Sequence, residues 1–346
     1  MDSYSLIRPL LFALDPEFAH YVAFSSLRIA NFLSRCVGYE TPRATGAPVK
    51  LLGLDFPNRI GLAAGADKNA RYLNALGFFG FGFVEVGTMT PQPQAGRARP
   101  RMFRLTDYEA VINRMGFPNE GVEVVAKRLE THKFRGIVGA NISVNATTPI
   151  EHFVDDFVKC FRRVHRLADY VAINVSSPNT QNLRDMQDKA RLRELFERLR
   201  QERSGVTGPN EKPVPILIKI SPDLTEQQLR DTGELALELK VDGVIATNTT
   251  LTREGVSDHP LAKEPGGLSG APLAPLALRV VSKLRKVIGE QMVIIGVGGV
   301  SSAEGYARMR DAGADLVQVY TGLVFRGPRL VRDILQYDAA KAAVTA

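Results

Sequence analysis

The chain has 346 residues, of which 45% are hydrophobic and 23% are charged, and its formal net charge is +7. This composition is typical of a globular protein and excludes disordered, collagen-like and coiled-coil chains. The two cysteines, Cys36 and Cys160, cannot form a disulfide scaffold or a four-ligand zinc site. We therefore expect a reducing compartment and no structural metal.

The positive charge is spread along the chain. In residues 191–200 acidic side chains interleave with arginines, and no strip combines aromatic with basic residues, so nucleic acid is not an expected partner. One cluster without an acid, Arg97, Arg99, Arg101 and Arg104, is interpreted as a solvated loop or as a surface that faces anions. The chain has no run of about 18 apolar residues and no positive signal segment at its start, which predicts neither a spanning helix nor export.

Residues 1–45 predict two helices. The first places its apolar residues on one face: Ile7, Leu10, Leu11 and Leu14. Asp15, Pro16 and Glu17 then form the typical start of a second helix, with a cap, a proline in the first turn and an acid near the positive end of the dipole. This second helix is apolar on more than one side. It is interpreted either as part of a hairpin that plugs one end of the domain that follows, or as an appendage that also meets a membrane surface or an apolar ligand.

Short apolar runs, continuous rather than alternating, recur eight times after the hairpin. They are residues 61–65, 83–87, 137–142, 170–175, 215–220, 243–248, 292–297 and 316–320. Runs of this kind are typical of parallel strands that are buried on both faces. Amphipathic helical patterns lie between them, and the spacing is close to that of a (β/α)8 barrel, which usually has about 250 residues. Because the glycine-rich turn of a doubly wound sheet is missing after the first strand, we predict an α/β fold, a TIM barrel over residues 46–346 with an N-terminal helical hairpin extension over residues 1–45.

Polar side chains follow or end most of these strands, where barrel enzymes carry their chemistry. They include Lys68, Thr88, Asn141, Asn174, Ser177, Asn179, Lys219, Thr247, Asn248 and Thr249. An apolar barrel tolerates such groups only when they are paired, so a polar ligand that spans several strands is expected. Glycine-rich turns after the sixth, seventh and eighth strands suit a phosphate, and the buried Lys219 suits a flavin that gains negative charge on reduction, although a structural ion pair remains the alternative.

Ser177 is the sharpest single candidate for catalysis. No Gly-x-Ser-x-Gly turn surrounds it, and no histidine falls at a strand end, which disfavours hydrolase chemistry. As a proton acceptor, Ser177 would have to pass the proton to water or to a hydroxyl such as Thr180.

Ordered motifs along nearly the whole chain resemble the membrane-associated, quinone-using class 2 of the dihydroorotate dehydrogenases. These are LDPE (14–17) with His20, GLAAGADK (61–68), GTMTP (87–91), PRMFRL (100–105), INRMGF (112–117), INVSSPNT (173–180), ATNTT (246–250), GGLSG (266–270), IGVGG (295–299) and VYTG (319–322). The resemblance implies an enzyme that uses FMN to oxidise (S)-dihydroorotate to orotate in de novo pyrimidine biosynthesis.

The resemblance also implies a role for particular residues. Ser177 would take the C5 proton while FMN N5 accepts hydride from C6. The residues implied to hold the substrate are Lys68, Asn113, Arg114, Met115, Gly116, Phe117, Asn174, Asn179, Asn248 and Thr249. Those implied to hold the flavin are Ala64, Gly65, Ala66, Asp67, Lys68, Thr88, Asn141, Asn174, Lys219 and Thr247, with Gly270, Gly299, Tyr320 and Thr321 at its phosphate.

The class follows from two features, since the soluble class 1 enzymes carry a cysteine where this chain has Ser177 and lack an N-terminal extension. The resemblance thus implies a quinone that enters between the two helices past His20, Arg104 and Tyr320. It further implies a monomeric peripheral protein on the cytoplasmic face of the cell membrane. One stretch departs from the family pattern, because Ser143 and Val144 replace a usual Gly-Lys pair and remove a lysine.

Two alternatives stay open at this stage. One is another FMN barrel oxidoreductase that acts on a pyrimidine-like ring or an enone. The other is a barrel without enzymatic activity that binds a phosphate-bearing ligand.

Overall fold

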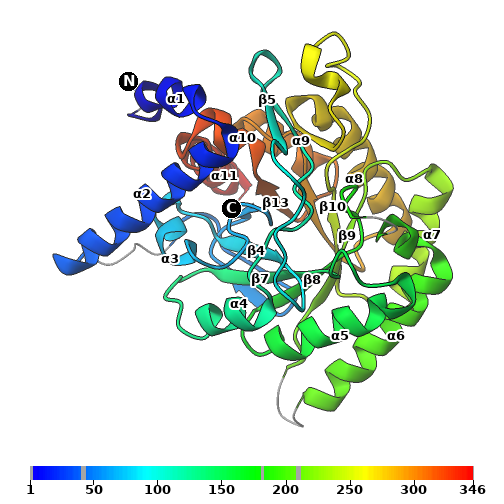
Figure 1. Cartoon of the computed structure of the whole chain (residues 1–346). Coiled ribbons are helices and arrows are strands. Elements are labelled where there is room, and N and C mark those ends of the chain that lie inside the picture. The colour runs from blue at the N-terminus through cyan, green and yellow to red at the C-terminus, as the bar shows by residue number, and fades with distance from the viewer. Residues whose placement is uncertain (1–2, 40–43, 181–182, 208–211, 346) are drawn as a thin grey trace.

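The protein, seen here in a computed structural model, is described over residues 3–39, 44–180, 183–207 and 212–345. Its central strands are β3 (Ile60–Leu62), β4 (Phe83–Met89), β7 (Ile137–Ile142), β8 (Tyr170–Asn174), β9 (Ile216–Ile220), β10 (Gly243–Ala246), β12 (Val293–Val297) and β13 (Leu316–Val319). These eight strands form a closed barrel in the order β10-β12-β13-β3-β4-β7-β8-β9 (Figure 1). Every neighbouring pair in it is parallel, so all their carboxyl ends meet at one rim.

The predicted α/β barrel with a helical extension is confirmed, and all eight predicted strands are present. The first strand is shorter than predicted. It covers Ile60–Leu62 in place of 61–65, because the chain turns toward the barrel opening after Leu62 and Gly65 adopts a φ of 102°. Such a left-handed conformation suits glycine, and it ends the strand.

Helices form the outer layer of the barrel (Figure 1). They are α3 (Leu73–Leu76), α4 (Val122–Leu129), α5 (Phe153–Val164), α6 (Lys189–Val206), α7 (Glu226–Glu238), α8 (Ala274–Ile288), α9 (Ala303–Asp311), α10 (Thr321–Arg326) and α11 (Arg329–Thr345). The longer ones bury an apolar face against the strands, as the predicted stripe Leu192, Leu195, Phe196 and Leu199 of α6 does. Sequence caps fix their starts, for example the reciprocal capping box between Thr225 and Gln228 at α7.

The amino end of the barrel is closed by a β-hairpin that the sequence reading missed. Its strands β1 (Val49–Leu51) and β2 (Leu54–Phe56) pair antiparallel. The fully buried ring of Phe56 meets Phe83 edge to face, with ring centroids 5.5 Å apart. This end of the barrel is therefore closed without the N-terminal helices, which line a pocket together with Leu62, Met102 and Tyr320 toward the other rim.

A second small sheet lies at the carboxyl end, in the order β11-β6-β5. Its antiparallel strands are β5 (Met102–Leu105), β6 (Ala110–Asn113) and β11 (Gly267–Gly270). Two segments far apart in the chain thus meet over the barrel opening. Asn113 is paired directly with Gly267 in this sheet.

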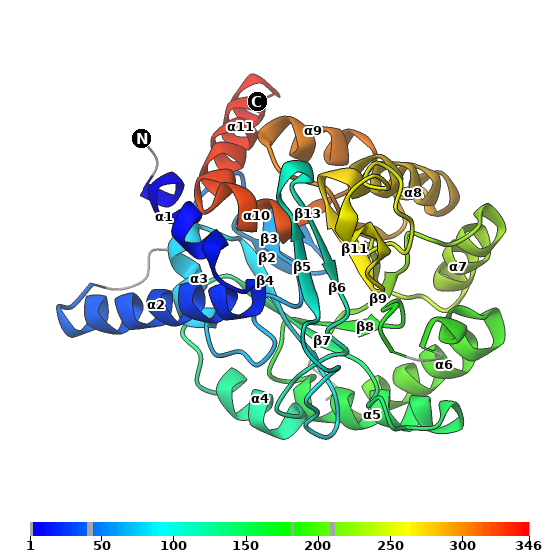
Figure 2. The same ribbon diagram turned by 45° about the horizontal axis from the view of Figure 1, so that its top comes forward.

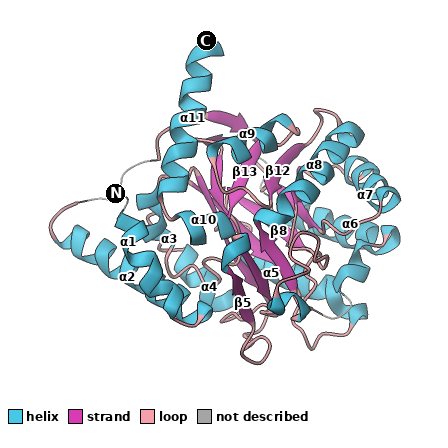
Figure 3. Ribbon diagram, turned by 90° about the horizontal axis from the view of Figure 1, so that it is seen from above, coloured by secondary structure: helices cyan, strands magenta, loops and turns pink. Residues whose placement is uncertain are grey.

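The N-terminal hairpin consists of α1 (Ser3–Ala13) and α2 (Pro16–Cys36). The predicted cap is present, since the Asp15 carboxylate accepts hydrogen bonds from the backbone N–H groups of Glu17 and Phe18, each 3.0 Å long. Both helices lie at one side of the barrel, and the far end of α2 projects beyond it (Figures 2 and 3). The predicted boundary at residue 45 stays a prediction, because residues 40–43 at the junction lie outside the described part of the chain.

The arginine cluster binds the hairpin to the barrel. Arg101 is only 7% exposed, and its guanidinium contacts both carboxylate oxygens of Glu17, at 2.6 and 3.0 Å. Arg104 donates to the backbone oxygens of Phe12 and Leu14. The interpretation of the cluster as a solvated or anion-facing loop is thus wrong for these two arginines. Arg99, 73% exposed, also pairs with Glu17 at 3.1 Å.

Within the described residues, no helix has both the length and the apolar character needed to cross a membrane. In the same part of the chain no three histidine, cysteine or acidic side chains gather in a way that could hold a metal ion.

Candidate active site

A pocket opens at the carboxyl rim of the barrel, which we call the barrel pocket. It gathers most of the predicted site residues, namely Ala64, Gly65, Lys68, Thr88, Asn113, Met115, Gly116, Phe117, Asn174, Ser177, Asn179, Lys219, Thr247, Asn248, Thr249, Gly270, Gly299, Tyr320 and Thr321. Its described lining includes two lysines and neither a carboxylate nor a histidine. A pocket of this charge suits an anionic ligand.

Four of the residues predicted to hold the flavin or the substrate do not line the barrel pocket. Ala66 faces a neighbouring pocket, and Asp67 turns its carboxylate to the backbone N–H groups of Arg71 and Tyr72, at 2.9 and 2.7 Å. Burial raises the pKa of Asp67, although these N–H groups oppose the shift. The Asp67 side chain thus holds the turn after β3, and the predicted cofactor contact of this residue stays a prediction.

Arg114 also points away from the barrel pocket. Its guanidinium pairs with Glu264 at 2.6 Å and lies over the ring of Phe103, 4.6 Å from the ring centroid. In this position it fixes the loop that carries Met115, Gly116 and Phe117 without facing the barrel pocket itself.

Asn141, the fourth residue outside the lining, supports the residues that are in it. Its Oδ1 accepts from Thr88 Oγ1 at 2.6 Å and from Asn174 Nδ2 at 3.2 Å. Its own Nδ2 donates to Glu85 at 2.7 Å. Three strands thereby lock the amide of Asn174, which borders the pocket, into one orientation.

Glu85 lies beneath the barrel pocket and was missed by the sequence reading. Its fully buried carboxylate accepts from Gln318 Nε2 at 2.8 Å and from Tyr170 at 3.1 Å, and it lies 3.7 Å from Lys219 Nζ. Burial, and then the charge of Glu85, raises the pKa of Tyr170. The structural ion pair considered for Lys219 is present. Gln318 Oε1, in contrast, is buried without a hydrogen-bond partner.

Ser177 lies in the turn after β8 and is 5% exposed. Its Oγ accepts from the backbone N–H of Asn179 at 3.2 Å, which leaves the hydroxyl proton free to be donated. Thr180 lies three residues on, and its Oγ1 is buried and makes no hydrogen bond within the described residues. A buried hydroxyl without a partner is costly, and it suits a proton acceptor that works only when substrate is bound.

Lys68 is the second charged group of the barrel pocket. Its ammonium donates to the backbone oxygen of Gly65 at 2.7 Å. Burial lowers the pKa of Lys68 to about 8, against the pull of the Glu17 carboxylate. At neutral pH the amine is therefore still largely charged and can meet an anion.

The far side of the barrel pocket is made from glycines after β12 and β11. Gly299 has a φ of 71°, and a Cβ there would lie 2.4 Å from that of Ala274, at the start of α8. Gly270 has a φ of 101°, and a Cβ there would lie 2.1 Å from the backbone oxygen of Glu109. Both positions require glycine, and both glycines line this part of the pocket. In this fold the loops after the last two strands are the usual phosphate site.

A second pocket, the hairpin pocket, lies between α1, α2 and the barrel. Its lining is mostly apolar and includes Leu11, Phe12, Ala19, Ala23, Phe24, Leu27, Leu62, Val324 and Pro328, together with His20 and Arg104. Met102, Val111 and Tyr320 line both pockets, so the two are separated by a wall of three side chains.

Two polar side chains of the hairpin pocket, His20 and Tyr320, are held in one protonation state. Burial lowers the pKa of His20 to about 3, with a further contribution from Lys68, and its ring stacks on Phe24 with centroids 4.3 Å apart. Burial raises the pKa of Tyr320 to about 12. His20 and Tyr320 are therefore both neutral at physiological pH.

Ser143 and Val144, where the family pattern has a lysine, lie behind the barrel pocket. The Ser143 hydroxyl donates to the backbone oxygen of Asn174 at 2.9 Å, and Val144 is fully buried in the apolar core. A lysine at this position would bring a charge into the layer behind the pocket. In this chain the charge beneath the pocket therefore comes from Lys219 and Glu85.

Comparison with known proteins gives consistent results. A family model described as dihydroorotate dehydrogenase matches residues 47–338. A curated protein of Acinetobacter baylyi named dihydroorotate dehydrogenase (quinone) is 45% identical over 95% of this chain and 98% of that protein. A protein of the same name from Alkalilimnicola ehrlichii is 48% identical over 96% of this chain and 98% of that protein. A solved ligand-free DHODH from Eimeria tenella is 35% identical, with a TM-score of 0.87 over 96% of each chain. The structure of the same enzyme with ferulenol gives a TM-score of 0.84, over 96% of this chain and 92% of that one.

Proposed function

The chain belongs to the dihydroorotate dehydrogenase family, and from this we propose that it oxidises (S)-dihydroorotate to orotate with a membrane quinone as electron acceptor, in de novo pyrimidine biosynthesis. One structural observation carries the proposal. A polar, positively charged pocket and an apolar pocket share a wall of three side chains. Two substrates of opposite polarity can thus approach one redox group from two sides.

The family uses a flavin, and we take it to be FMN. The barrel pocket fits this cofactor because Gln318 offers a buried, unpartnered amide oxygen, Lys219 offers a cation, and the glycine turns border a phosphate-sized end. When bound, a flavin would supply a hydride acceptor for C6 of the substrate and a two-electron carrier to the quinone. We assign its ring contacts to Ala64, Gly65, Lys68, Thr88, Asn174, Lys219 and Thr247, and its phosphate contacts to Gly270, Gly299, Tyr320 and Thr321.

We assign the substrate to the amide-rich side of the barrel pocket. Asn113, Asn174, Asn179, Asn248 and Thr249 offer both donors and acceptors, which complement an imide ring with a carboxylate, and Lys68 adds a cation. In this proposal Ser177 takes the C5 proton and Thr180 receives it next. The loop of Met115, Gly116 and Phe117 covers the substrate.

The hairpin pocket is the proposed entrance for the quinone. Neutral His20 and neutral Tyr320 cost little beside an apolar ring, whereas Arg104 is held by backbone oxygens of the hairpin. Large apolar side chains on α2 are solvent-exposed, including Phe18, Tyr21, Ile29, Phe32 and Leu33. They support a peripheral position on the cytoplasmic face of the cell membrane. We also propose that the protein is a monomer.

Of the two alternatives, a barrel without enzymatic activity is disfavoured by the relatives, which are all named as dehydrogenases. A flavin enzyme for another pyrimidine-like ring differs from the proposal only in its substrate. The experiment below separates both from the proposed reaction.

The test follows the visible spectrum of the purified protein without oxygen. We expect a flavin band that bleaches when dihydroorotate is added and returns when a quinone is added, but not when NAD is added. Dihydrouracil and a simple saturated ketone, each of which can give up a hydride and a proton, serve as controls for the substrate. A colourless protein, or a band that only the control substrates bleach, would contradict the proposal.

A further inference from the structure

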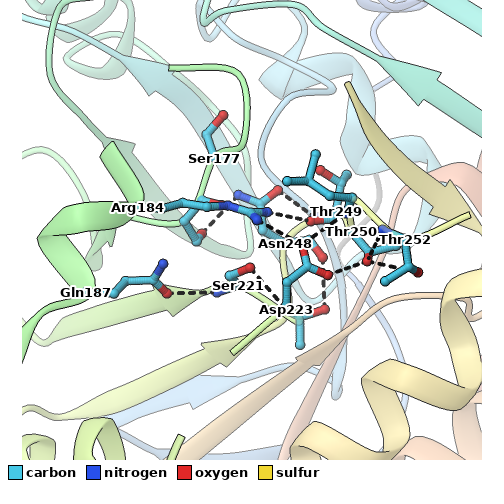
Figure 4. A network of polar contacts seen from close by, with 12 residues as sticks. Ser177, Arg184, Gln187, Ser221, Asp223, Asn248, Thr249, Thr250 and Thr252 are labelled. Carbon is cyan, nitrogen blue, oxygen red and sulfur yellow. Dashed lines mark hydrogen bonds and ion pairs between the residues drawn. The ribbon is translucent and has the colours of Figure 1, made fainter. Parts of the chain in front are cut away.

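Three loops at the barrel rim meet around one arginine that does not line the barrel pocket. Arg184 belongs to a short 3-10 helix, Leu183–Gln187, which follows the turn of Ser177. Its side chain reaches toward the loops after β9 and β10 (Figure 4). It is 22% exposed, and no residue of the proposed reaction is bonded to it through a side chain.

The guanidinium of Arg184 uses three of its nitrogen atoms on three different loops. Nη1 donates to the carboxylate of Asp223 at 2.8 Å. Nε donates to the backbone oxygen of Ser176, and Nη2 donates to that of Thr249, both at 3.3 Å. The first of these oxygens belongs to the peptide group that joins Ser176 to Ser177. The second belongs to a residue assigned to the substrate.

Asp223 is itself held firmly, so it can serve as an anchor. Its carboxylate also accepts from the hydroxyl of Thr250 and from the backbone N–H of Leu251, the latter at 2.9 Å. Its backbone N–H donates to Ser221 Oγ at 3.1 Å. The anchor therefore remains in place without Arg184.

We infer that Arg184, anchored by Asp223, is a positioning residue that sets the Ser176–Ser177 peptide at a fixed distance from Thr249. It thereby aims the Ser177 hydroxyl at the substrate. This inference rests on the proposed function, in which Ser177 is the base. The short ion pair with Asp223 fixes the guanidinium in place. The two longer hydrogen bonds, to the backbone oxygens of Ser176 and Thr249, then orient the loops that carry these residues.

Only an arginine can hold all three loops at once, because its nitrogens lie in one rigid plane. A lysine keeps the charge and the pair with Asp223, but its single ammonium cannot reach three acceptors that lie in different directions. A base displaced by about 1 Å loses on the order of 10²-fold in rate. The catalytic step should thus depend on the shape of this side chain as well as on its charge.

The experiment compares Arg184→Lys and Asp223→Asn with the wild type by stopped-flow reduction of the flavin with dihydroorotate. We expect at least about a tenfold slower reduction in each variant. Neither Arg184 nor Asp223 lines the barrel pocket or the hairpin pocket. The flavin content and the rate of reoxidation by quinone should therefore be unchanged. Arg193→Lys is the matched control, because Arg193 pairs with Glu238 on the surface between α6 and α7 at 2.7 Å and contacts none of the three loops.

A double-mutant cycle with Ser177→Ala decides whether Arg184 acts through the serine. If it does, Arg184→Lys changes the residual rate of the Ser177→Ala enzyme by less than about twofold. The same fold loss in both backgrounds, or no loss in the single variants, overturns the inference. A Ser177→Ala enzyme that is reduced at the wild-type rate is a different result, which removes the serine from the proposed function and the inference with it.

Discussion

Ser177 is a weak base, because a serine hydroxyl gives up its own proton only at high pH. No histidine or carboxylate lines the described part of the barrel pocket, so no ordinary partner activates it. What the site offers in place of a partner is positive charge from Lys68 and Lys219 and an unpartnered hydroxyl at Thr180. In the proposed reaction, the serine can therefore take the C5 proton only while the hydride leaves C6 of the substrate for the flavin.

Replacing Ser177 by alanine tests this role directly. We expect Ser177→Ala to keep its flavin and to be reduced by dihydroorotate at least about 10²-fold more slowly, as is usual when a general base is lost. Stopped-flow absorbance at the flavin band measures the rate. Ser176→Ala is not a clean control, because Ser176 Oγ bonds Asn174 and Asn248. Thr131→Ala is used instead, since the Thr131 hydroxyl bonds only backbone oxygens of α4 and lies outside the pocket lining. Reduction at the wild-type rate removes Ser177 from the mechanism.

His20 makes stability depend on pH in a defined direction. Its folded pKa is about 3 and its ordinary value is 6.5, so between these values the unfolded chain binds a proton that the folded protein does not. Stability must then fall as the pH drops through this window. From about pH 7.5 to about pH 5, we expect His20 to cost about 2 kcal/mol of unfolding free energy.

The measurement is urea unfolding of the wild type and His20→Gln at both pH values. The unfolding free energy of His20→Gln should fall less between the two pH values, by the contribution of His20. At about pH 7.5 the imidazole is neutral in both the folded and the unfolded chain, so the difference between the two proteins at that pH measures the packing lost by the substitution. An equal decrease in both proteins contradicts the shift.

Single residues also mark where sequence reasoning succeeded and where it stopped. The polar strand ends were found because a polar group in a buried strand needs a partner. The same logic applies to Glu85, inside the run of β4, but its partners Tyr170, Gln318 and Lys219 lie on three other strands, and the run itself does not show them. Asp67 was assigned to the ligand because it sits in a motif. A sequence does not show that its carboxylate bonds backbone N–H groups four and five residues ahead.

At the scale of elements, length decides what could be predicted. The eight barrel strands are continuous apolar runs, and their bounds were found to within a few residues. Strands β1 and β2 have three residues each, too few to show a period. Strands β5, β6 and β11 have four residues each. β5 and β6 pair with each other locally, whereas β11 gains its identity only by pairing with β6 across more than 150 residues of chain, as Asn113 and Gly267 do.

The missed hairpin β1–β2 should be essential for stability. Phe56 is fully buried and contacts the inward-facing ring of Phe83. We expect Phe56→Ala to lower the free energy of unfolding by about 3–5 kcal/mol, the usual cost of removing a buried aromatic ring. Urea unfolding measures the loss, and flavin reduction should keep its rate because Phe56 lies at the opposite end from Ser177.

Leu251→Ala is the matched control, since this side chain is 50% exposed, and its cost should stay within about 0.5 kcal/mol. A loss below about 1 kcal/mol for Phe56→Ala would mean that the barrel closes without this ring.

For the whole molecule, the N-terminal hairpin has two opposite surfaces. One side is fastened to the barrel by Glu17, whose pKa is held below its usual value by Arg101 and Arg99 even though burial alone would raise it. The other side exposes apolar residues of α2, whose end projects from the barrel (Figure 2). A helix apolar on both sides is stable in water only if something else covers its outer face.

We expect lipid to cover this outer face. Phe32 and Leu33 are 66% and 58% exposed near the projecting end of α2. Changing both to serine should weaken co-sedimentation with phospholipid vesicles by at least about 30-fold, since each contributes roughly 1–2 kcal/mol of apolar burial. Flavin reduction by dihydroorotate should stay at the wild-type rate. The control is Leu251→Ser, at an apolar side chain that is 50% exposed and lies far from the hairpin in sequence. Equal binding by all three proteins would contradict the proposed membrane face.

The wall of Met102, Val111 and Tyr320 has a consequence for inhibitors. A compound bound in the hairpin pocket contacts side chains that also line the barrel pocket, in which orotate is proposed to bind. Thermodynamic reciprocity then applies: whatever factor the compound imposes on the affinity for orotate, orotate imposes on the affinity for the compound. The affinity of an inhibitor for the hairpin pocket thus depends on the concentration of orotate. Measuring inhibitor affinity at increasing orotate concentrations gives the coupling between the two sites.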